Sequence, residues 1–403
     1  MNKKYVVVLF DGMADYPNAE GNTPMSEADK PTVDHLAAHG EVGLCRTVPA
    51  GMKPGSDVAN LSVMGYDPAE YYTGRSPLEA LSMGIDMAPE DVSYRCNIVT
   101  LSDDEPYENK TMIDYSAGEI TTPEARELVN YLAKTLSLPA SLELYAGVSY
   151  RHCLIRRNGD TGMEFTPPHD ISDRKITDYL PKGEYADELL SLMKESEKLL
   201  KTHPVNLDRI KRGLRPATSI WLWGEGRKPM LKDFGEFRGK KAAVISAVDL
   251  IKGIGIAAGM DSIDVDGATG TIDSNFDGKA AAAIEALRDH DFVYVHLEAP
   301  DECGHQGNYA EKTEAISIID HKIVKPITDY LKKNGIPFKI AVLPDHATPV
   351  SLKTHVSDPV PYLIYDSDNE VEGVTKLDEK NAADTANRLE SGVALMNRLF
   401  EEK

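Results

Sequence analysis

The 403-residue sequence contains only four cysteines and two tryptophans, and it has no long apolar run. The cysteines stand far apart and form no Cys-x-x-Cys pair, which argues against zinc ribbons and against a disulfide framework. We therefore expect a cytoplasmic location, where thiols stay reduced. No stretch approaches the roughly 20 consecutive apolar residues that span a bilayer, so a membrane partner is not expected.

Positive charge is also scarce. The 44 basic side chains are outnumbered by 65 acidic ones, which gives a formal net charge of −21. Such an excess repels nucleic acid, so we expect no nucleic-acid partner. An anionic substrate would have to be held by metal ions and a few well-placed arginines. The sequence also lacks the Gly-x-x-x-x-Gly-Lys-Ser/Thr loop of common ATP-binding proteins, and it leaves the oligomeric state open.

Short runs rich in Val and Ile recur between longer helical patterns. Because these runs do not alternate with polar residues, they indicate strands buried on both faces. The sequence therefore predicts an α/β protein with a largely parallel sheet covered by helices. Strands are expected at 5–10, 96–101, 242–248, 292–297, 338–343 and 361–365, and helices at 26–39, 57–64, 122–136, 185–201, 278–288 and 310–333.

The length of the chain favours a second domain beside the main core. The segment 103–170 differs from its surroundings, since it opens with a charged stretch and continues with one helical pattern and two strand-like pieces. We expect it to be a small α+β insertion that acts as a substrate-binding or lid domain. Residues 1–102 and 171–403 would then form the core domain.

Potential metal ligands follow the apolar runs. Asp11, Asp301 and Asp345 each come shortly after one of them. Because ligands collect at the carboxyl ends of strands in open α/β sheets, we expect the three carboxylates to converge. The spacing Asp301-x-x-x-His305 places two ligands within one loop or helical turn. The full set of candidate ligands is Asp11, Asp301, His305, Asp345, His346 and His355.

One serine can act as a nucleophile beside these ligands. Ser56 lies in the segment Lys-Pro-Gly-Ser-Asp, just before a helical pattern, where backbone N–H groups and the helix dipole favour a phosphate group. A serine in this position is by itself usually a helix cap. Adjacent metal ions would convert its hydroxyl to an alkoxide, so the combination predicts a two-metal enzyme that acts on phosphate esters.

The segments around these residues resemble the metal-binding framework of the alkaline phosphatase superfamily. More narrowly, they resemble the archaeal-type cofactor-independent phosphoglycerate mutases, in the same order along nearly the whole chain. The resemblance implies an alkaline-phosphatase-like three-layer αβα sandwich and two divalent ions, without 2,3-bisphosphoglycerate. The mixture of ligand types favours manganese, with zinc, cobalt and magnesium as alternatives. The matching segments are 8–13, 54–57, 299–305, 343–346 and 353–361.

The resemblance also implies a role for each residue. Asp301, His305 and His355 would hold one metal ion. The second ion would be bound by Asp11, Ser56, Asp345 and His346. Ser56 would carry the phosphoryl group as a phosphoserine while 3-phosphoglycerate is converted to 2-phosphoglycerate, a step of glycolysis. Three arginines in family-like segments, Arg75, Arg95 and Arg151, are expected to bind the carboxylate and phosphate of this small metabolite.

The segment 113–120 departs from the family, which tends to carry more positive residues where this chain has Tyr115, Ser116 and Glu119. Together with the Trp-Leu-Trp segment at 221–223, this variant resembles a branch proposed to phosphorylate homoserine. A phosphotransferase acting on an amino-acid hydroxyl is therefore the first alternative function. A phosphatase or phosphonate hydrolase is the second, and a metal-binding protein without enzymatic activity is the third.

Overall fold

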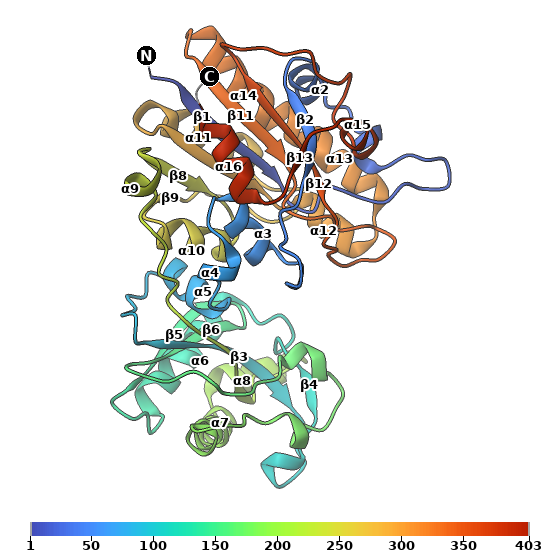
Figure 1. Ribbon diagram of the computed structural model, residues 1–403. Helices are drawn as coiled ribbons and strands as arrows, with labels where there is room; N and C mark the ends of the chain where they lie inside the picture. The colour runs from blue at the N-terminus through green and yellow to red at the C-terminus, as the bar shows by residue number, and fades with distance from the viewer. Residues whose placement is uncertain (1, 402–403) are drawn as a thin grey trace. The chain divides into compact units, whose positions relative to one another are not determined.

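In the computed structural model, which describes residues 2–401, the chain folds into two units. The first unit contains the chain up to Tyr72 and again from Met230 onward, and the second is Thr73–Pro229. Figure 1 shows helices and strands in both of them.

The first unit is built on an eight-stranded sheet in the order β13-β2-β12-β11-β1-β10-β8-β9. Strand β1 lies between β10 and β11 and is parallel to both, whereas β12 is antiparallel to both of its neighbours. The expected largely parallel sheet is therefore confirmed. The strands are β1 (Lys4–Phe10), β2 (Glu41–Cys45), β8 (Ala242–Ile245), β9 (Asp261–Ile263), β10 (Phe292–Leu297), β11 (Phe338–Leu343), β12 (Val360–Asp366) and β13 (Arg388–Leu389).

Helices cover both faces of this sheet. Val6, Val8 and Phe10 of β1 belong to a core cluster with residues of α11 and α14, whereas Tyr5 packs edge-on against Phe400 of α16 at 4.9 Å between ring centroids. Figure 1 shows α16 crossing in front of the strands. The helices are α1 (Pro24–Glu27), α2 (Pro31–Ala38), α3 (Ser56–Val63), α4 (Pro68–Tyr71), α9 (Phe234–Arg238), α10 (Asp249–Ala257), α11 (Phe276–Asp289), α12 (Ala299–Gln306), α13 (Tyr309–Ile319), α14 (Lys325–Lys333), α15 (Glu379–Asp384) and α16 (Gly392–Phe400).

Two long helices expected from the sequence are each divided. The helical pattern at 26–39 becomes α1 and α2, because Pro31 begins a new helix. The pattern at 310–333 contains a π-helical turn, η4 (Asp320–Val324), between α13 and α14. Pro326 follows this turn and has no N–H to donate to the preceding turn, which accounts for the wider spacing there.

The second unit is an α+β structure around an antiparallel sheet. Its central strand β3 pairs with β4, β6 and β7, and β6 also pairs with β5. Trp221 of β7 is fully buried in the core between sheet and helices. The elements are β3 (Val92–Leu101), β4 (Met112–Asp114), β5 (Leu142–Val148), β6 (Arg151–Arg156), β7 (Ser219–Arg227), α5 (Ser76–Ser82), α6 (Thr122–Thr135), α7 (Ala186–Leu200), α8 (Pro204–Lys211), η1 (Tyr107–Asn109), η2 (Pro168–Ile171) and η3 (Thr177–Tyr179).

The second unit is larger than the insertion expected at 103–170, since it begins at Thr73 and ends at Pro229. The run 96–101, assigned to the core domain from the sequence, is the end of β3 and lies in the centre of the second sheet. The physical reason is the long-range pairing of β3 with β7, which ties 92–99 to 219–227. The charged stretch at 103 marks only the end of β3.

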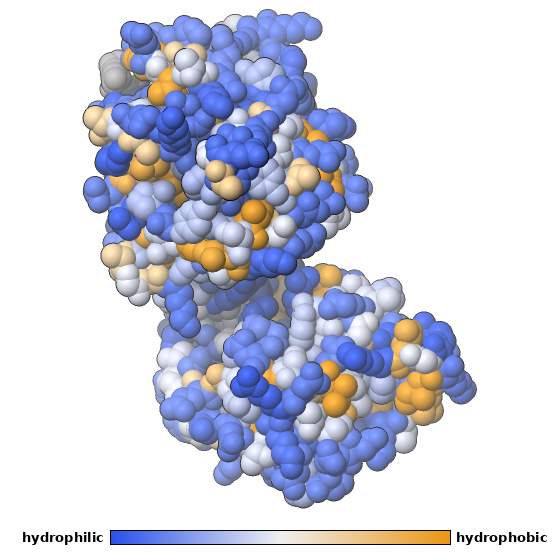
Figure 2. Space-filling view, turned by 90° about the vertical axis from the view of Figure 1, so that its right-hand side faces the viewer, coloured by the Kyte–Doolittle hydropathy of each residue, from blue (hydrophilic) through white to orange (hydrophobic). Residues whose placement is uncertain are grey.

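The surface and the cysteines agree with the composition. Figure 2 shows a mostly hydrophilic surface with scattered apolar patches. All four cysteines are buried and unpaired, and Cys303 packs in the core of the first unit. Among the described residues, no helix has both the length and the apolar character needed to cross a membrane.

Candidate active site

The structure brings the predicted ligands and Ser56 together in the first unit. Asp11 directly follows β1, and Asp345 comes two residues after β11. Asp301 lies in the first turn of α12, which follows β10. Because these three parallel strands are neighbours, their carboxyl ends meet at one edge. The remaining members are Ser56 at the start of α3, His305 in the last turn of α12, His346 beside Asp345, and His355 in the segment between β11 and β12.

A first ligand group forms around Asp301. His305 Nε2 lies 3.2 Å from Asp301 Oδ2, and His355 Nε2 lies 3.4 Å from Asp301 Oδ1. The two Nε2 atoms are 2.9 Å apart. Two imidazole nitrogens and a carboxylate that face one point form a donor set suited to a divalent transition metal. Ligand atoms of Asp301, His346 and His355 also fall within 4.8 Å of one another.

A second group forms around His346. Its Nε2 atom lies 3.6 Å from Asp11 Oδ1 and 3.4 Å from Asp345 Oδ2. The same nitrogen is 3.1 Å from Ser56 Oγ. In the described part of the chain, Asp11 Oδ1 is buried without a hydrogen-bond partner. A buried carboxylate oxygen of this kind is costly unless a cation or a donor meets it, so the residues fit a bound divalent ion. His346 therefore belongs to both groups.

The electrostatics of the site also favour a cation. Burial, together with the nearby Asp345 and Asp301, raises the pKa of Asp11 well above its usual value. The hydrogen bond to Asp301 raises the pKa of His305 to about 9, whereas burial lowers the pKa of His346. Because Asp345 and Asp301 repel the charge of Asp11, a divalent ion bound here would supply positive charge that stabilises the ionised form of Asp11.

His296, which orients Asp11, was not among the site residues expected from the sequence. This histidine is fully buried in β10, and its Nε2 lies 2.8 Å from Asp11 Oδ2. Its Nδ1 is 3.1 Å from the hydroxyl of Ser246, so both ring nitrogens have partners. A histidine inside an otherwise apolar strand was the available signal, because a buried imidazole requires polar partners.

Asn60 was also missed. Its side-chain amide donates to Asp345 Oδ2 at 2.8 Å and to the Ser56 carbonyl at 2.9 Å, while Tyr294 donates to its oxygen at 2.7 Å. Asn60 thereby links the proposed nucleophile to a ligand. It lies four residues after Ser56, one helical turn away on the same face of α3, and that spacing was the signal in the sequence.

Two further residues shape the ligand loops. The hydroxyl of Thr348 donates to Asp301 Oδ1 and lies 3.2 Å from His346 Nδ1. Gly12 has φ +63°, and its N–H donates to Asp345 Oδ1. A Cβ atom at Gly12 would lie 2.5 Å from Asp301 Oδ1. Only glycine allows the backbone to approach the ligand this closely.

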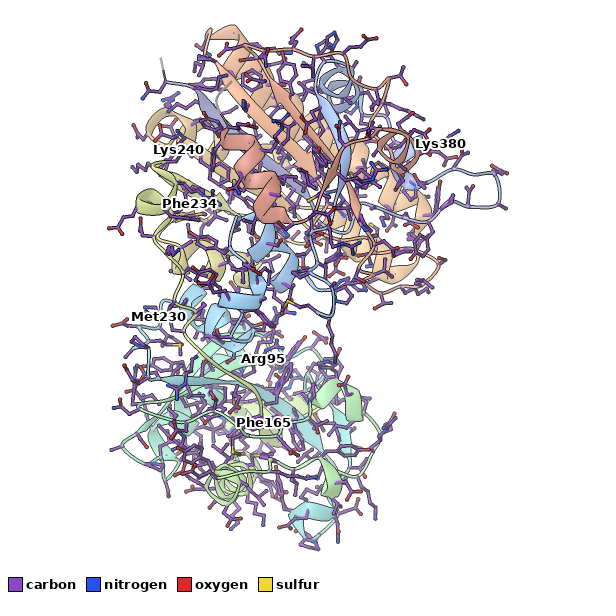
Figure 3. All side chains as sticks on the ribbon, in the orientation of Figure 1. Arg95, Phe165, Met230, Phe234, Lys240 and Lys380 are labelled. Carbon is purple, nitrogen blue, oxygen red and sulfur yellow. The ribbon has the colours of Figure 1, made fainter. Side chains whose placement is uncertain are left out.

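The three predicted arginines lie in the second unit. Glu79 binds two of them, with 3.0 Å to Arg75 Nε and 2.9 Å to Arg95 Nε. Arg95, labelled in Figure 3, also stacks over the Trp223 ring at 4.0 Å from the centroid. Arg151 is exposed and lies over Tyr150. Arg75 and Arg95 are therefore held in one cluster, with Arg151 at the start of the neighbouring strand β6.

The segment 113–120 forms a capped turn in the same unit. Asp114 Oδ1 accepts hydrogen bonds from the backbone N–H and the hydroxyl of Ser116, both at 2.7 Å. The Tyr115 ring packs edge-on against Tyr150 and His169 at 5.7 and 6.0 Å. Ser116 therefore serves the turn, and Tyr115 belongs to an aromatic cluster.

A sheet that gathers carboxylates, imidazoles and one serine at its carboxyl edge is the fold and site of a phosphoryl-transfer enzyme. Comparison with known proteins identifies the family. The model of the family described as 2,3-bisphosphoglycerate-independent phosphoglycerate mutase matches residues 37–206. The chain is 50% identical to a protein of that name from Methanosarcina barkeri, over 94% of both chains. It is 48% identical to a Geobacter sulfurreducens protein named as a probable enzyme of this kind, over 99% of this chain and 100% of the relative. The chain belongs to this family.

Solved structures agree with this assignment. The PH0037 protein from Pyrococcus horikoshii matches with a TM-score of 0.84 and 29% identity, over 100% of this chain and 99% of its own. A cofactor-independent phosphoglycerate mutase from Thermoplasma acidophilum matches with a TM-score of 0.67 and 26% identity, over 99% of each chain. The expected α/β fold and the expected family are therefore confirmed.

Proposed function

We propose that the protein interconverts 3-phosphoglycerate and 2-phosphoglycerate through a phosphoserine on Ser56, without 2,3-bisphosphoglycerate. The observation that carries the proposal is the 3.1 Å approach of Ser56 Oγ to His346 Nε2, beside a buried carboxylate oxygen of Asp11 that lacks a partner in the described chain. The names of relatives that match over nearly the whole chain support the same reaction.

In this proposal the ligands divide between two divalent ions. Manganese is the metal that suits these donors best. Asp301, His305 and His355 bind one ion in this proposal. Bound ions supply the positive charge that favours the serine alkoxide and neutralises the phosphoryl oxygens. The second ion is held by Asp11, Ser56, Asp345 and His346.

The chain's own residues carry out the transfer in two balanced steps. The Ser56 hydroxyl gives up its proton and Ser56 Oγ forms a bond to phosphorus, while the bond from phosphorus to one glycerate oxygen breaks and that oxygen takes up a proton. The other glycerate hydroxyl then gives up its proton and forms a bond to phosphorus, while the bond to Ser56 Oγ breaks and the serine hydroxyl regains a proton. Ser56 is the first residue of α3, so the positive end of the helix dipole stabilises the phosphoserine. Asn60 holds the first turn of α3 to Asp345 throughout.

In this proposal, residues of the second unit bind the substrate. Arg75, Arg95 and Arg151 offer planar guanidinium groups, which suit bidentate contacts with carboxylate or phosphate. Retention of the glycerate between the two steps distinguishes a mutase from a phosphatase. If the glycerate escapes, water hydrolyses the phosphoserine and free phosphate is released. The reaction assigns the protein to glycolysis in the cytoplasm, with a small phosphorylated metabolite as its partner.

A paired substrate assay tests the function. Protein stripped of metal and reloaded with Mn²⁺ is given 3-phosphoglycerate, and the formation of 2-phosphoglycerate is followed through its dehydration by added enolase. Parallel reactions contain homoserine with ATP, and 3-phosphoglycerate with a detector for free phosphate. We expect isomerisation only. Turnover of homoserine alone would identify an amino-acid kinase, and release of phosphate alone would identify a phosphatase.

A further inference from the structure

Lys312 is a fully buried lysine next to the ligand loops. It lies on α13 with 0% of its side chain exposed. Its ammonium group donates to the carbonyls of Ala14 at 3.2 Å and Thr348 at 2.8 Å, and it pairs with Asp15 Oδ2 at 2.8 Å. These three contacts use all three N–H donors of the ammonium group.

The partners of Lys312 belong to the two loops that carry metal ligands. Ala14 and Asp15 continue the loop of Asp11, and Thr348 continues the loop of Asp345 and His346. The backbone N–H of Thr348 donates to the Ala14 carbonyl at 3.2 Å. The carboxylate of Asp15 accepts from the N–H of Val350 at 3.1 Å. The pair of Lys312 and Asp15 therefore ties the loop after β1 to the loop after β11.

Thr348 transmits this connection to the ligands themselves. The carbonyl of Thr348 accepts a hydrogen bond from Lys312. The hydroxyl of Thr348 donates to Asp301 and lies 3.2 Å from His346 Nδ1. Asp301 belongs to the first ligand group, and His346 belongs to both. The buried ammonium group of Lys312 is thus connected, through Thr348 alone, to ligands of both groups.

A role in stability alone explains this arrangement poorly. Burying an ammonium group and a carboxylate is costly, and an apolar pair of similar volume commonly supports a fold as well or better. Groups that hold metal ligands in place, by contrast, affect the affinity for the metal strongly.

We propose that Lys312, together with Asp15, is a positioning residue that sets the spacing of the two ligand loops and thereby the affinity for divalent ions. The proposal rests on the metal-dependent function proposed above, and its readout is metal binding. It adds Lys312, Asp15 and Thr348 to the residues on which the site depends, although none of them is a ligand.

The test uses the double variant Lys312→Met/Asp15→Asn, which removes both buried charges and leaves neither unpaired. The matched control is Lys30→Met/Asp34→Asn. Lys30 is also buried, and its ammonium group pairs with Asp34 Oδ1 at 2.6 Å. Both residues lie in the first unit, Lys30 directly before α2 and Asp34 within it. Affinity for Mn²⁺ is measured from the electron paramagnetic resonance signal of the free ion, and the geometry of the site from the visible spectrum of the Co²⁺ form.

We expect the Lys312/Asp15 variant to fold, to bind Mn²⁺ about 10- to 100-fold more weakly and to give an altered Co²⁺ spectrum. The Lys30/Asp34 variant should keep the affinity and the spectrum of the parent. Parental Mn²⁺ affinity and Co²⁺ spectrum in the Lys312/Asp15 variant would overturn the proposal. Failure of this variant to fold would also overturn it, because the ion pair would then serve the fold. A parent protein that binds Mn²⁺ without converting 3-phosphoglycerate would remove the proposed reaction but leave this test intact.

Discussion

The hydroxyl oxygen of Ser56 lies 3.1 Å from Nε2 of His346, although 290 residues separate them in the chain. This contact joins the start of α3 to the loop after β11. Since the same imidazole belongs to both ligand groups, the serine stands next to the residue on which the two groups meet.

Replacement of Ser56 by Ala is expected to reduce isomerisation by at least about 10³-fold, because the phosphoryl group loses its carrier. Transfer of labelled phosphate from the substrate to the protein should disappear as well. Binding of Mn²⁺ is the control, since most ligands remain. A Ser56→Ala protein with full activity would rule out the phosphoserine route.

Replacement of Asn60 by Ala should weaken Mn²⁺ binding by about 10-fold or more, because Asp345 loses the donor that orients it. The hydroxyl of Tyr294 would also lose its buried acceptor, at a cost of about 1–3 kcal/mol in unfolding free energy. Chemical denaturation and metal titration measure the two effects. The matched variant is Tyr294→Phe, which removes the Tyr294 hydroxyl but leaves the amide of Asn60 on Asp345, so it should change metal affinity much less.

Replacement of Gly12 by Ala should abolish tight metal binding, because the new Cβ would collide with the carboxylate of Asp301. Gly239 provides the control. It has φ +64°, close to the +63° of Gly12, and a Cβ there would meet nothing within 4 Å. Both variants should lose about 1 kcal/mol of unfolding free energy from the left-handed backbone. Gly12→Ala should lose more than this, because its Cβ would also lie 2.7 Å from Asp301 Cα. Equal metal affinity in the two variants would show that the close approach of the Gly12 backbone to Asp301 does not affect metal binding.

Replacement of Glu79 by Gln should raise KM for 3-phosphoglycerate by about 10-fold with little change in kcat. The reason is that Arg75 and Arg95 lose the carboxylate that holds both Nε atoms. Steady-state kinetics measure the split between KM and kcat. Glu143→Gln is the control, because it removes the ion pair to Arg157 elsewhere in the same unit. A loss confined to kcat would assign Glu79 a different role.

His152 should make the stability of the protein depend on pH. Burial lowers the pKa of this histidine from 6.5 to about 3, so the folded protein keeps it neutral while the unfolded chain takes up a proton below pH 6.5. The stability that it contributes is therefore complete above pH 6.5 and is lost as the pH falls toward 3. Between pH 7 and 5.5 the loss should amount to about 1 kcal/mol. Urea unfolding at both pH values measures it, and His152→Gln should reduce the difference by this amount.

Local patterns predicted the main strands and most of the helices. The runs 5–10, 292–297 and 338–343 became β1, β10 and β11, because strands buried on both faces need apolar residues at every position. The same patterns could not reveal the π-helical turn at 320–324, where only the hydrogen-bond spacing changes. They also misplaced the limits of the second unit, because the pairing of β3 with β7 cannot be recognised from the sequence of either segment alone.

The ligand types of this protein, and their positions after strands, can be recognised in the amino-acid sequence, since an Asp after an apolar run is a local feature. The residues that support these ligands depend on how the chain packs in three dimensions. Asp11 and His296 meet across 285 residues of chain, and Asn60 reaches Asp345 across the same separation. Contacts of this kind depend on the order of strands in the sheet and on the packing of helices across it. That order is a property of the whole core, and no single segment encodes it.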